Sequence, residues 1–178
     1  MAVKWMIRER VQVYRGVCHW VLRRGTALLL LTCSVVLADA SERTPVDRFT
    51  IVFVCEHGAV KSTVAAAYFN RIARDRGLPY VAVSRGINLY PEIPAVIRRG
   101  LAEDGLAPQD DAPRDLRSNE ASAAARVIAF DRVPSERSGA ASVIYWSDVP
   151  LVSKNYVAGR NAILQHIEGL AAELTGSR

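Results

Sequence analysis

Eight consecutive residues place a thiol, a glycine, a cation and a hydroxyl in one short segment of the chain. The segment consists of Cys55, Glu56, His57, Gly58, Ala59, Val60, Lys61 and Ser62. An apolar run of strand length at residues 50–55 leads into it, and an alanine-rich stretch typical of a helix follows. A loop between a strand and a helix presents several backbone N–H groups together with the positive end of the helix dipole. We therefore predict that this loop binds a phosphate-like oxyanion.

The residue types in the loop also predict chemistry on the bound anion. Gly58 allows a tight turn of the backbone. Lys61 adds a positive charge, and Ser62 can cap the helix or donate a hydrogen bond to the thiol. The donors that hold an anion also stabilise a thiolate, which makes Cys55 a candidate nucleophile facing that anion. The alternative interpretation is a buried cysteine that ends a strand beside an ordinary loop.

The remainder of the chain from residue 48 onward predicts the elements that must position this loop. Apolar runs of strand length lie at residues 50–55, 80–84, 126–131 and 142–146. Helical patterns lie at residues 62–76, near 95–104, and around Ile163, Ile167, Leu170 and Leu174. The polar stretch 107–120 is typical of a loop with at most a short helix. Such alternation predicts an α/β fold with a parallel sheet, whose strands end at one common edge. The residues expected at that edge are Cys55, Arg85, Asp131 and Asp148.

The loop, written Cys-X5-Lys-Ser, resembles the Cys-X5-Arg-Ser phosphate loop of low-molecular-weight protein tyrosine phosphatases and of thioredoxin-coupled arsenate reductases. The resemblance extends from about residue 48 to residue 174. Three further segments match in order along the chain. They are Ser84-Arg85-Gly86 after the second strand, Phe130-Asp131-Arg132 after the third, and residues 146–150, which contain Asp148 and Pro150.

This resemblance implies a four-stranded parallel sheet with helices on both faces, in three layers, and a two-step reaction on phosphate monoesters. Cys55 would attack phosphorus while Asp148 protonates the leaving oxygen, and Asp148 would then activate the water that hydrolyses the phosphocysteine. The remaining loop residues would contact the substrate: Glu56, His57, Gly58, Ala59, Val60 and Ser62. An alternative interpretation of Asp148 is a turn residue before Pro150. An alternative interpretation of Asp131 is a residue with a structural role at the end of its strand.

The main departure from the family pattern is Lys61, which stands where the family has an arginine that grips two phosphate oxygens. An ammonium keeps the charge and loses the bidentate fork, which predicts turnover slower by on the order of 10²-fold or more. Arg85 is predicted to restore the fork from the side, and the alternative is that it pairs with a carboxylate such as Glu92. Two functions therefore stay open. One is a phosphatase that uses Cys55, Lys61 and Asp148, and the other is a non-catalytic oxyanion-binding module of the same fold.

Cys55 is the only cysteine in residues 41–178, because Cys18 and Cys33 lie nearer the N-terminus. Thioredoxin-coupled arsenate reduction needs further cysteines to relay the disulfide, so we do not expect that activity. His57 and His166 do not complete a metal ligand set with Cys55, and the sequence predicts no metal or cofactor. His57 is either a surface loop residue or a residue that assists the thiolate.

Residues 1–40 have the features of a signal peptide. A 13-residue apolar run at 26–38 follows Arg23 and Arg24, and residues 38–40 have the small-x-small pattern of a cleavage site. We predict a short linker at 41–47 and an exported, periplasmic domain at 48–178, not stably inserted in a membrane once the leader is cleaved. The alternative is an uncleaved membrane anchor at 26–38.

The basic charge of the chain is concentrated in this leader. The formal net charge is +5, and six of the 23 Lys and Arg residues lie in residues 1–40, against two acidic residues. The remainder is nearly neutral, which argues against a nucleic-acid partner and leaves a phosphate-containing substrate as the predicted ligand. The sequence predicts no particular oligomeric state.

Overall fold

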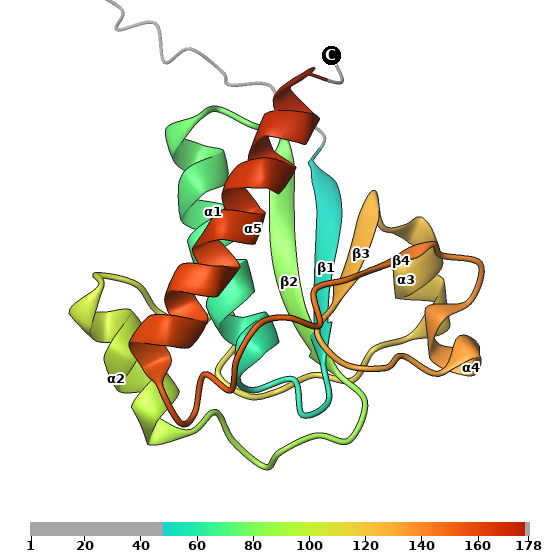
Figure 1. Cartoon of the computed structure of the whole chain (residues 1–178). Coiled ribbons are helices and arrows are strands. Elements are labelled where there is room, and N and C mark those ends of the chain that lie inside the picture. The colour runs from blue at the N-terminus through green and yellow to red at the C-terminus, as the bar shows by residue number, and fades with distance from the viewer. Residues whose placement is uncertain (1–47, 177–178) are drawn as a thin grey trace, which may run out of the picture. The chain divides into compact units, whose positions relative to one another are not determined.

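Four parallel strands form one sheet in the order β2-β1-β3-β4 (Figure 1). The computed structural model describes residues 48–176, so the predicted leader at 1–40 and linker at 41–47 lie outside the described residues. The strands are β1 (Phe49–Cys55), β2 (Tyr80–Gly86), β3 (Arg126–Ala129) and β4 (Val143–Tyr145). All four predicted strands are confirmed. The last two are shorter than predicted, because the chain leaves the sheet once the pairing of Ala129 with Tyr145 is made.

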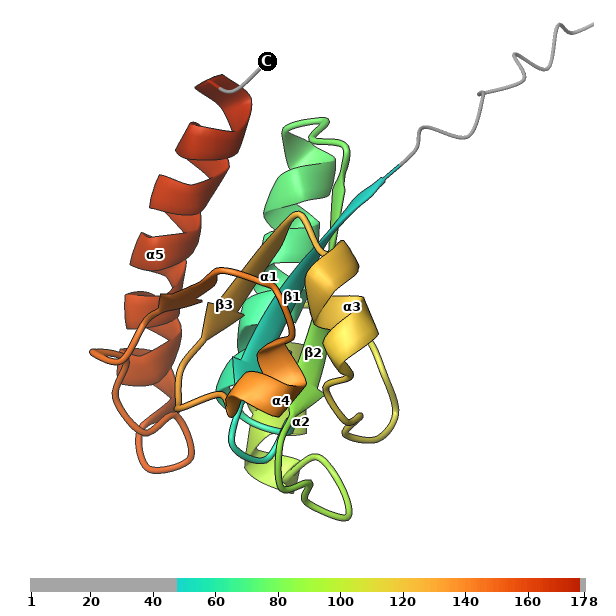
Figure 2. The ribbon, with the colours of Figure 1, turned by 90° about the vertical axis from the view of Figure 1, so that its right-hand side faces the viewer.

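The described residues also form five helices. They are α1 (Lys61–Asp75), α2 (Ala95–Glu103), α3 (Ser118–Ala123), α4 (Ser135–Ser138) and α5 (Tyr156–Gly176). The two long helices, α1 and α5, lie on one face of the sheet, and the short helices α3 and α4 lie on the other (Figure 2). The predicted three-layer α/β fold is therefore confirmed, and α4 is a turn of helix that the sequence pattern did not predict.

The central strand β1 reads as an uninterrupted apolar run because both of its faces are covered. Successive side chains of a strand point to opposite faces. Ile51 and Phe53 therefore pack into the cluster formed with α1 and α5, whereas Val52 and Val54 pack into the smaller cluster beside α3. Two hydrophobic layers thus hold β1 and fix the position of the loop that follows it.

Helix α5 lays one apolar stripe on the sheet, as its spacing predicts. The residues of this stripe, all buried, are Ile163, Ile167, Leu170 and Leu174. Contact between α5 and α1 completes this layer. No helix within residues 48–176 is both long and apolar enough to cross a membrane.

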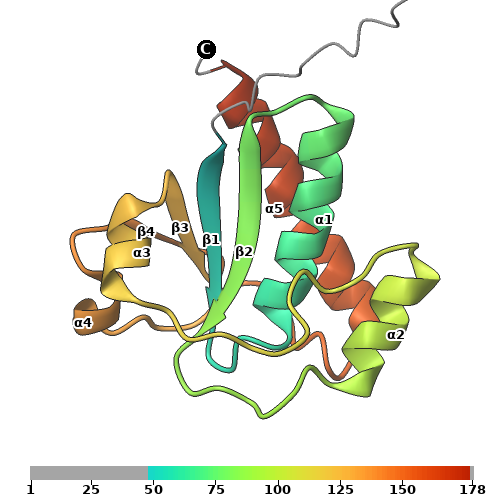
Figure 3. The ribbon, with the colours of Figure 1, turned by 180° about the vertical axis from the view of Figure 1, so that it is seen from behind.

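Two glycines let the loop after β1 sit directly on the end of β2. The loops that follow the strands gather at one end of the sheet (Figure 3). There Gly58 has a φ of +63°, and a Cβ on Gly86 would lie 2.5 Å from the Gly58 nitrogen and 2.8 Å from its Cα. Both clashing atoms belong to the backbone, so no side chain can move aside to make room.

We expect Gly86→Ala to lower the free energy of unfolding by about 1–3 kcal/mol, because the added methyl overpacks a backbone contact. Urea unfolding measures this change. Gly169→Ala on α5 is the matched control, since a Cβ at Gly169 meets nothing within 4 Å. The control is expected to raise stability by about 0.5–1 kcal/mol, because glycine is unfavourable inside a helix. Equal stability of Gly86→Ala and the wild type would contradict this account of the loop.

Candidate active site

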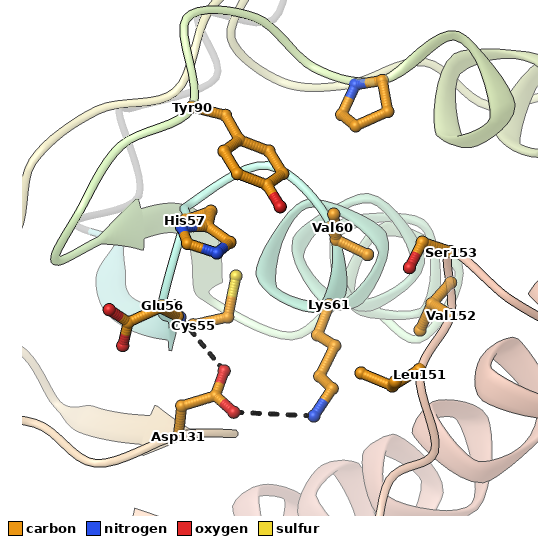
Figure 4. Close-up of a pocket in the computed structure, with 11 residues that line it drawn as sticks. Cys55, Glu56, His57, Val60, Lys61, Tyr90, Asp131, Leu151, Val152 and Ser153 are labelled. Carbon is orange, nitrogen blue, oxygen red and sulfur yellow. Dashed lines mark hydrogen bonds and ion pairs between the residues drawn. The ribbon is translucent and has the colours of Figure 1, made fainter.

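The loop of residues 56–60 joins β1 to α1, so that Cys55 is the last residue of the strand and Lys61 the first of the helix. The first N–H groups of a helix have no acceptor within the helix itself, and the helix dipole adds positive potential there. The Cys55 side chain projects from the strand end into a pocket beside these groups (Figure 4). The geometry thus places a thiol where an oxyanion would bind.

A chain of buried hydroxyl groups supports the thiol from behind. Cys55 Sγ lies 3.0 Å from Ser62 Oγ, and the Ser84 hydroxyl donates to Ser62 Oγ at 2.8 Å. With that bond made, the Ser62 hydroxyl has its own proton available for the sulfur. The carbonyl oxygen of Gly58 accepts the Thr63 hydroxyl at 3.2 Å, which ties the loop to α1. This network both orients Cys55 and stabilises negative charge on its sulfur.

Lys61 is buried beside the thiol and shares a carboxylate with the loop backbone. Its Nζ lies 3.7 Å from Asp131 Oδ1 and 6.0 Å from the centre of the Phe130 ring. The other carboxylate oxygen, Asp131 Oδ2, accepts the Glu56 N–H at 3.0 Å. Asp131, which follows β3, therefore fixes the start of the loop and the ammonium group together.

His57 and Tyr90 form one wall of the pocket. Their rings stack with centroids 3.9 Å apart and an angle of 11° between the planes. His57 Nδ1 lies 2.7 Å from the carbonyl oxygen of Asn88, and because a carbonyl only accepts, Nδ1 carries a proton. The Asn88 side chain donates to the Glu56 carboxylate, which points away from Lys61 (Figure 4). Glu56 therefore does not direct its charge at a bound anion.

The pocket in front of Cys55 has a volume of about 310 Å³. Its lining residues are Cys55, Glu56, His57, Val60, Lys61, Tyr90, Pro94, Asp131, Leu151, Val152 and Ser153. Five of these belong to the predicted site segment. Within that segment, Gly58, Ala59 and Ser62 are buried behind the pocket surface. No group of three or more His, Cys, Asp or Glu side chains that could hold a metal ion occurs between residues 48 and 176.

The predicted proton donor, Asp148, does not line this pocket. Both oxygens of its carboxylate lie near His166 Nε2, at 2.9 and 3.0 Å, and its side chain is 71% exposed. The reason is local packing, since the next residue, Val149, is buried in the core and Asp148 faces outward beside it. The same segment instead presents residues 151–153 to the pocket.

The contact with His166 predicts the titration of Asp148. The hydrogen bond from His166 lowers the pKa of Asp148 below its ordinary value. A carboxyl group with a lowered pKa in the folded protein adds stability above its unfolded pKa, and loses it as the pH falls through the folded value. We expect His166→Asn to raise the titration midpoint of Asp148, followed by NMR of the side-chain carboxyl carbon. An unchanged midpoint would show that His166 does not control this group.

The structure also corrects the prediction for Arg85, which does not enter the pocket. Arg85 Nε donates to both oxygens of Glu120, at 2.9 and 2.8 Å, and its guanidinium is 3.5 Å from Asp110. Adjacent residues of a strand point to opposite faces, and Ser84 takes the face toward Cys55. Arg85 must therefore point toward α3. It pairs with carboxylates, as the alternative interpretation predicts, but these belong to Glu120 and Asp110 and not to Glu92.

Several pocket residues were not predicted as site residues. Asp131 was expected to serve the strand end, and Leu151, Val152 and Ser153 were not singled out. Asp131 immediately follows a predicted strand at the edge where ligands bind, and that position is a signal for a site residue. The three others have no comparable signal, because they belong to an irregular segment whose path depends on which neighbouring valines are buried.

Fold and site together define a class of protein: a parallel α/β domain with a cysteine at the mouth of a phosphate-type loop. The sequence matches the family of low molecular weight phosphotyrosine protein phosphatases over residues 50–165. The chain belongs to this family. No protein with a curated description matches it.

Solved structures share the fold. YfkJ from Bacillus subtilis is 21% identical with a TM-score of 0.65, and the match covers 74% of this chain and 97% of that one. The YwlE arginine phosphatase, determined with a phosphorylated active-site serine, is 21% identical with a TM-score of 0.63, covering 72% and 97%. A thioredoxin-dependent arsenate reductase from Corynebacterium glutamicum is 21% identical with a TM-score of 0.59, covering 76% and 66%.

Proposed function

We propose that this protein is a phosphatase that hydrolyses aromatic phosphate monoesters through a phosphocysteine intermediate. The observation that carries the proposal is the position of Cys55. Its sulfur faces a pocket at the start of α1 and lies within hydrogen-bond distance of the Ser62 hydroxyl. Membership of the low molecular weight phosphotyrosine protein phosphatase family supports the same chemistry. The stacked rings of His57 and Tyr90 suit an aromatic leaving group.

In the first step, Cys55 Sγ attacks phosphorus and forms a P–S bond while the bond to the leaving oxygen breaks. The loop N–H groups and Lys61 Nζ stabilise the charge on the phosphoryl oxygens. In the second step, water attacks phosphorus, the P–S bond breaks, and phosphate leaves with the thiolate restored. Because Lys61 lacks the bidentate fork of an arginine, we propose that turnover is slow for this family.

An arsenate reductase is a weaker proposal for this chain. The thioredoxin-coupled route passes a disulfide between cysteines, and residues 41–178 contain Cys55 alone. Reduction of arsenate by the purified protein with thioredoxin, at a rate that matches its phosphatase activity, would favour that function instead.

The experiment that tests the proposed function is detection of the covalent intermediate. Purified protein is mixed with 4-nitrophenyl phosphate, quenched within the first turnovers and examined by mass spectrometry. We expect release of nitrophenol and a phosphoryl group on Cys55. Hydrolysis without this adduct, or no hydrolysis at all, would contradict the proposal.

We also propose that the domain is exported, on the basis of the apolar run at 26–38 and the cleavage pattern after it. These residues lie outside the described part of the chain. N-terminal sequencing of the protein recovered from a bacterial periplasm is expected to begin at Ser41. An intact N-terminus on soluble periplasmic protein would contradict cleavage.

A further inference from the structure

Asp148, the proton donor that the sequence predicts, does not line the pocket. Asp148 is bonded to His166, and residues 151–153 offer the pocket two aliphatic side chains and one hydroxyl. An aryl phosphate whose leaving oxygen is strongly basic requires a proton donor for efficient cleavage. The proton donor therefore has to come from another wall of the pocket.

The two carboxylates of the pocket are poorly suited to this task. One oxygen of Asp131 accepts the Glu56 N–H, and the other is paired with the Lys61 ammonium, so this carboxylate acts as an acceptor. Glu56 accepts from Asn88, and its carboxylate points outward (Figure 4). Lys61 serves the phosphoryl oxygens. The hydroxyl groups of Tyr90 and Ser153 are much weaker acids than an imidazolium.

We propose that His57 is the catalytic residue that protonates the leaving oxygen, an assignment that rests on the proposed phosphatase function. Its imidazole lies beside the Tyr90 ring and lines the same pocket as Cys55 (Figure 4). The Asn88 carbonyl takes Nδ1–H at 2.7 Å, which leaves Nε2 as the nitrogen that exchanges a proton with substrate. Stacking on Tyr90 at 3.9 Å holds the ring in place.

The proton balance runs through one nitrogen. In the first step, Cys55 thiolate bonds to phosphorus, the bond to the aryl oxygen breaks, and that oxygen takes the proton from Nε2 of the His57 imidazolium. The neutral imidazole keeps the proton on Nδ1, which still donates its hydrogen bond to the Asn88 carbonyl. In the second step, Nε2 accepts a proton from the attacking water as the P–S bond breaks, which regenerates the imidazolium.

The test compares two leaving groups in His57→Asn. Asparagine can place an amide N–H near the position of Nδ1 and so retain the bond to Asn88, but it has no acid at the position of Nε2. Phenyl phosphate releases a strongly basic phenolate, whereas 4-nitrophenyl phosphate releases a weakly basic one. We expect kcat/KM to fall by about 10²–10⁴-fold for phenyl phosphate and by less than about tenfold for 4-nitrophenyl phosphate.

Two variants serve as comparisons. His166→Asn makes the same substitution outside the pocket, and Asp148→Asn removes the acid that the sequence predicted. Any loss in either is expected to be equal for the two substrates. Vanadate affinity of His57→Asn, measured by competition, shows whether its pocket is intact, and added imidazole is expected to restore part of its phenyl phosphate turnover.

Equal losses on the two substrates in His57→Asn with vanadate affinity retained would overturn the assignment. A loss confined to phenyl phosphate in Asp148→Asn would also overturn it, and would show that Asp148 is the proton donor. Failure of the proposed function is distinguishable, because the wild type would then hydrolyse neither ester.

Discussion

Cys55→Ser is expected to lower kcat for 4-nitrophenyl phosphate by at least about 10⁴-fold, because it removes the nucleophile of a unit whose members act together. Serine fits the same buried position and can keep the hydrogen bond to Ser62. Its hydroxyl is a far weaker nucleophile than a thiolate, since it stays protonated in this site. Steady-state kinetics measures the loss.

The same variant separates catalysis from binding. The loop N–H groups and Lys61 remain in Cys55→Ser, so phosphate affinity is expected to stay close to the wild-type value. Isothermal titration with phosphate measures this affinity. If the variant retained a substantial fraction of wild-type turnover, the thiol would not be the nucleophile. If turnover and binding were lost together, Cys55 would be needed for the loop conformation.

Lys61→Ala is expected to lower kcat by about 10²–10³-fold, the loss that follows removal of one donor from an oxyanion site. Lys61 is the only Lys or Arg residue that lines the pocket within the described residues. Its removal also leaves Asp131 without its ionic partner, which adds uncompensated negative charge beside the substrate. Both effects act in the same direction.

Lys61→Arg is the informative opposite change. A guanidinium can hold two phosphoryl oxygens at once, so we expect kcat to rise by about tenfold or more. Arg85→Ala is the matched control, because its guanidinium is bonded to Glu120 on the other face of the sheet. This control is expected to lower stability and to leave vanadate affinity unchanged. If Arg85→Ala lost vanadate affinity and Lys61→Arg gave no rise in kcat, Arg85 would belong to the oxyanion-binding site.

Local sequence patterns determined the fold and the phosphate-type loop. The apolar run at 50–55 is long enough for one strand and lacks alternation, which requires a sheet covered on both faces. The spacing of Ile163, Ile167, Leu170 and Leu174 defines a helix with one buried stripe. Cys55, Gly58 and Lys61 lie within seven residues of one another, so their relation depends only on the strand-to-helix turn.

Tertiary structure alone decided which distant side chains complete the site. Arg85 lies outside the pocket because Ser84 faces Cys55. Adjacent residues of a strand point to opposite faces, so the Arg85 side chain lies in the opposite layer, where it contacts Glu120. Asp148 turned outward because burial of Val149 set the direction of an irregular segment. The stacking of His57 on Tyr90 joins residues 33 positions apart. Such contacts depend on loop paths and packing between layers, and no residue spacing encodes them.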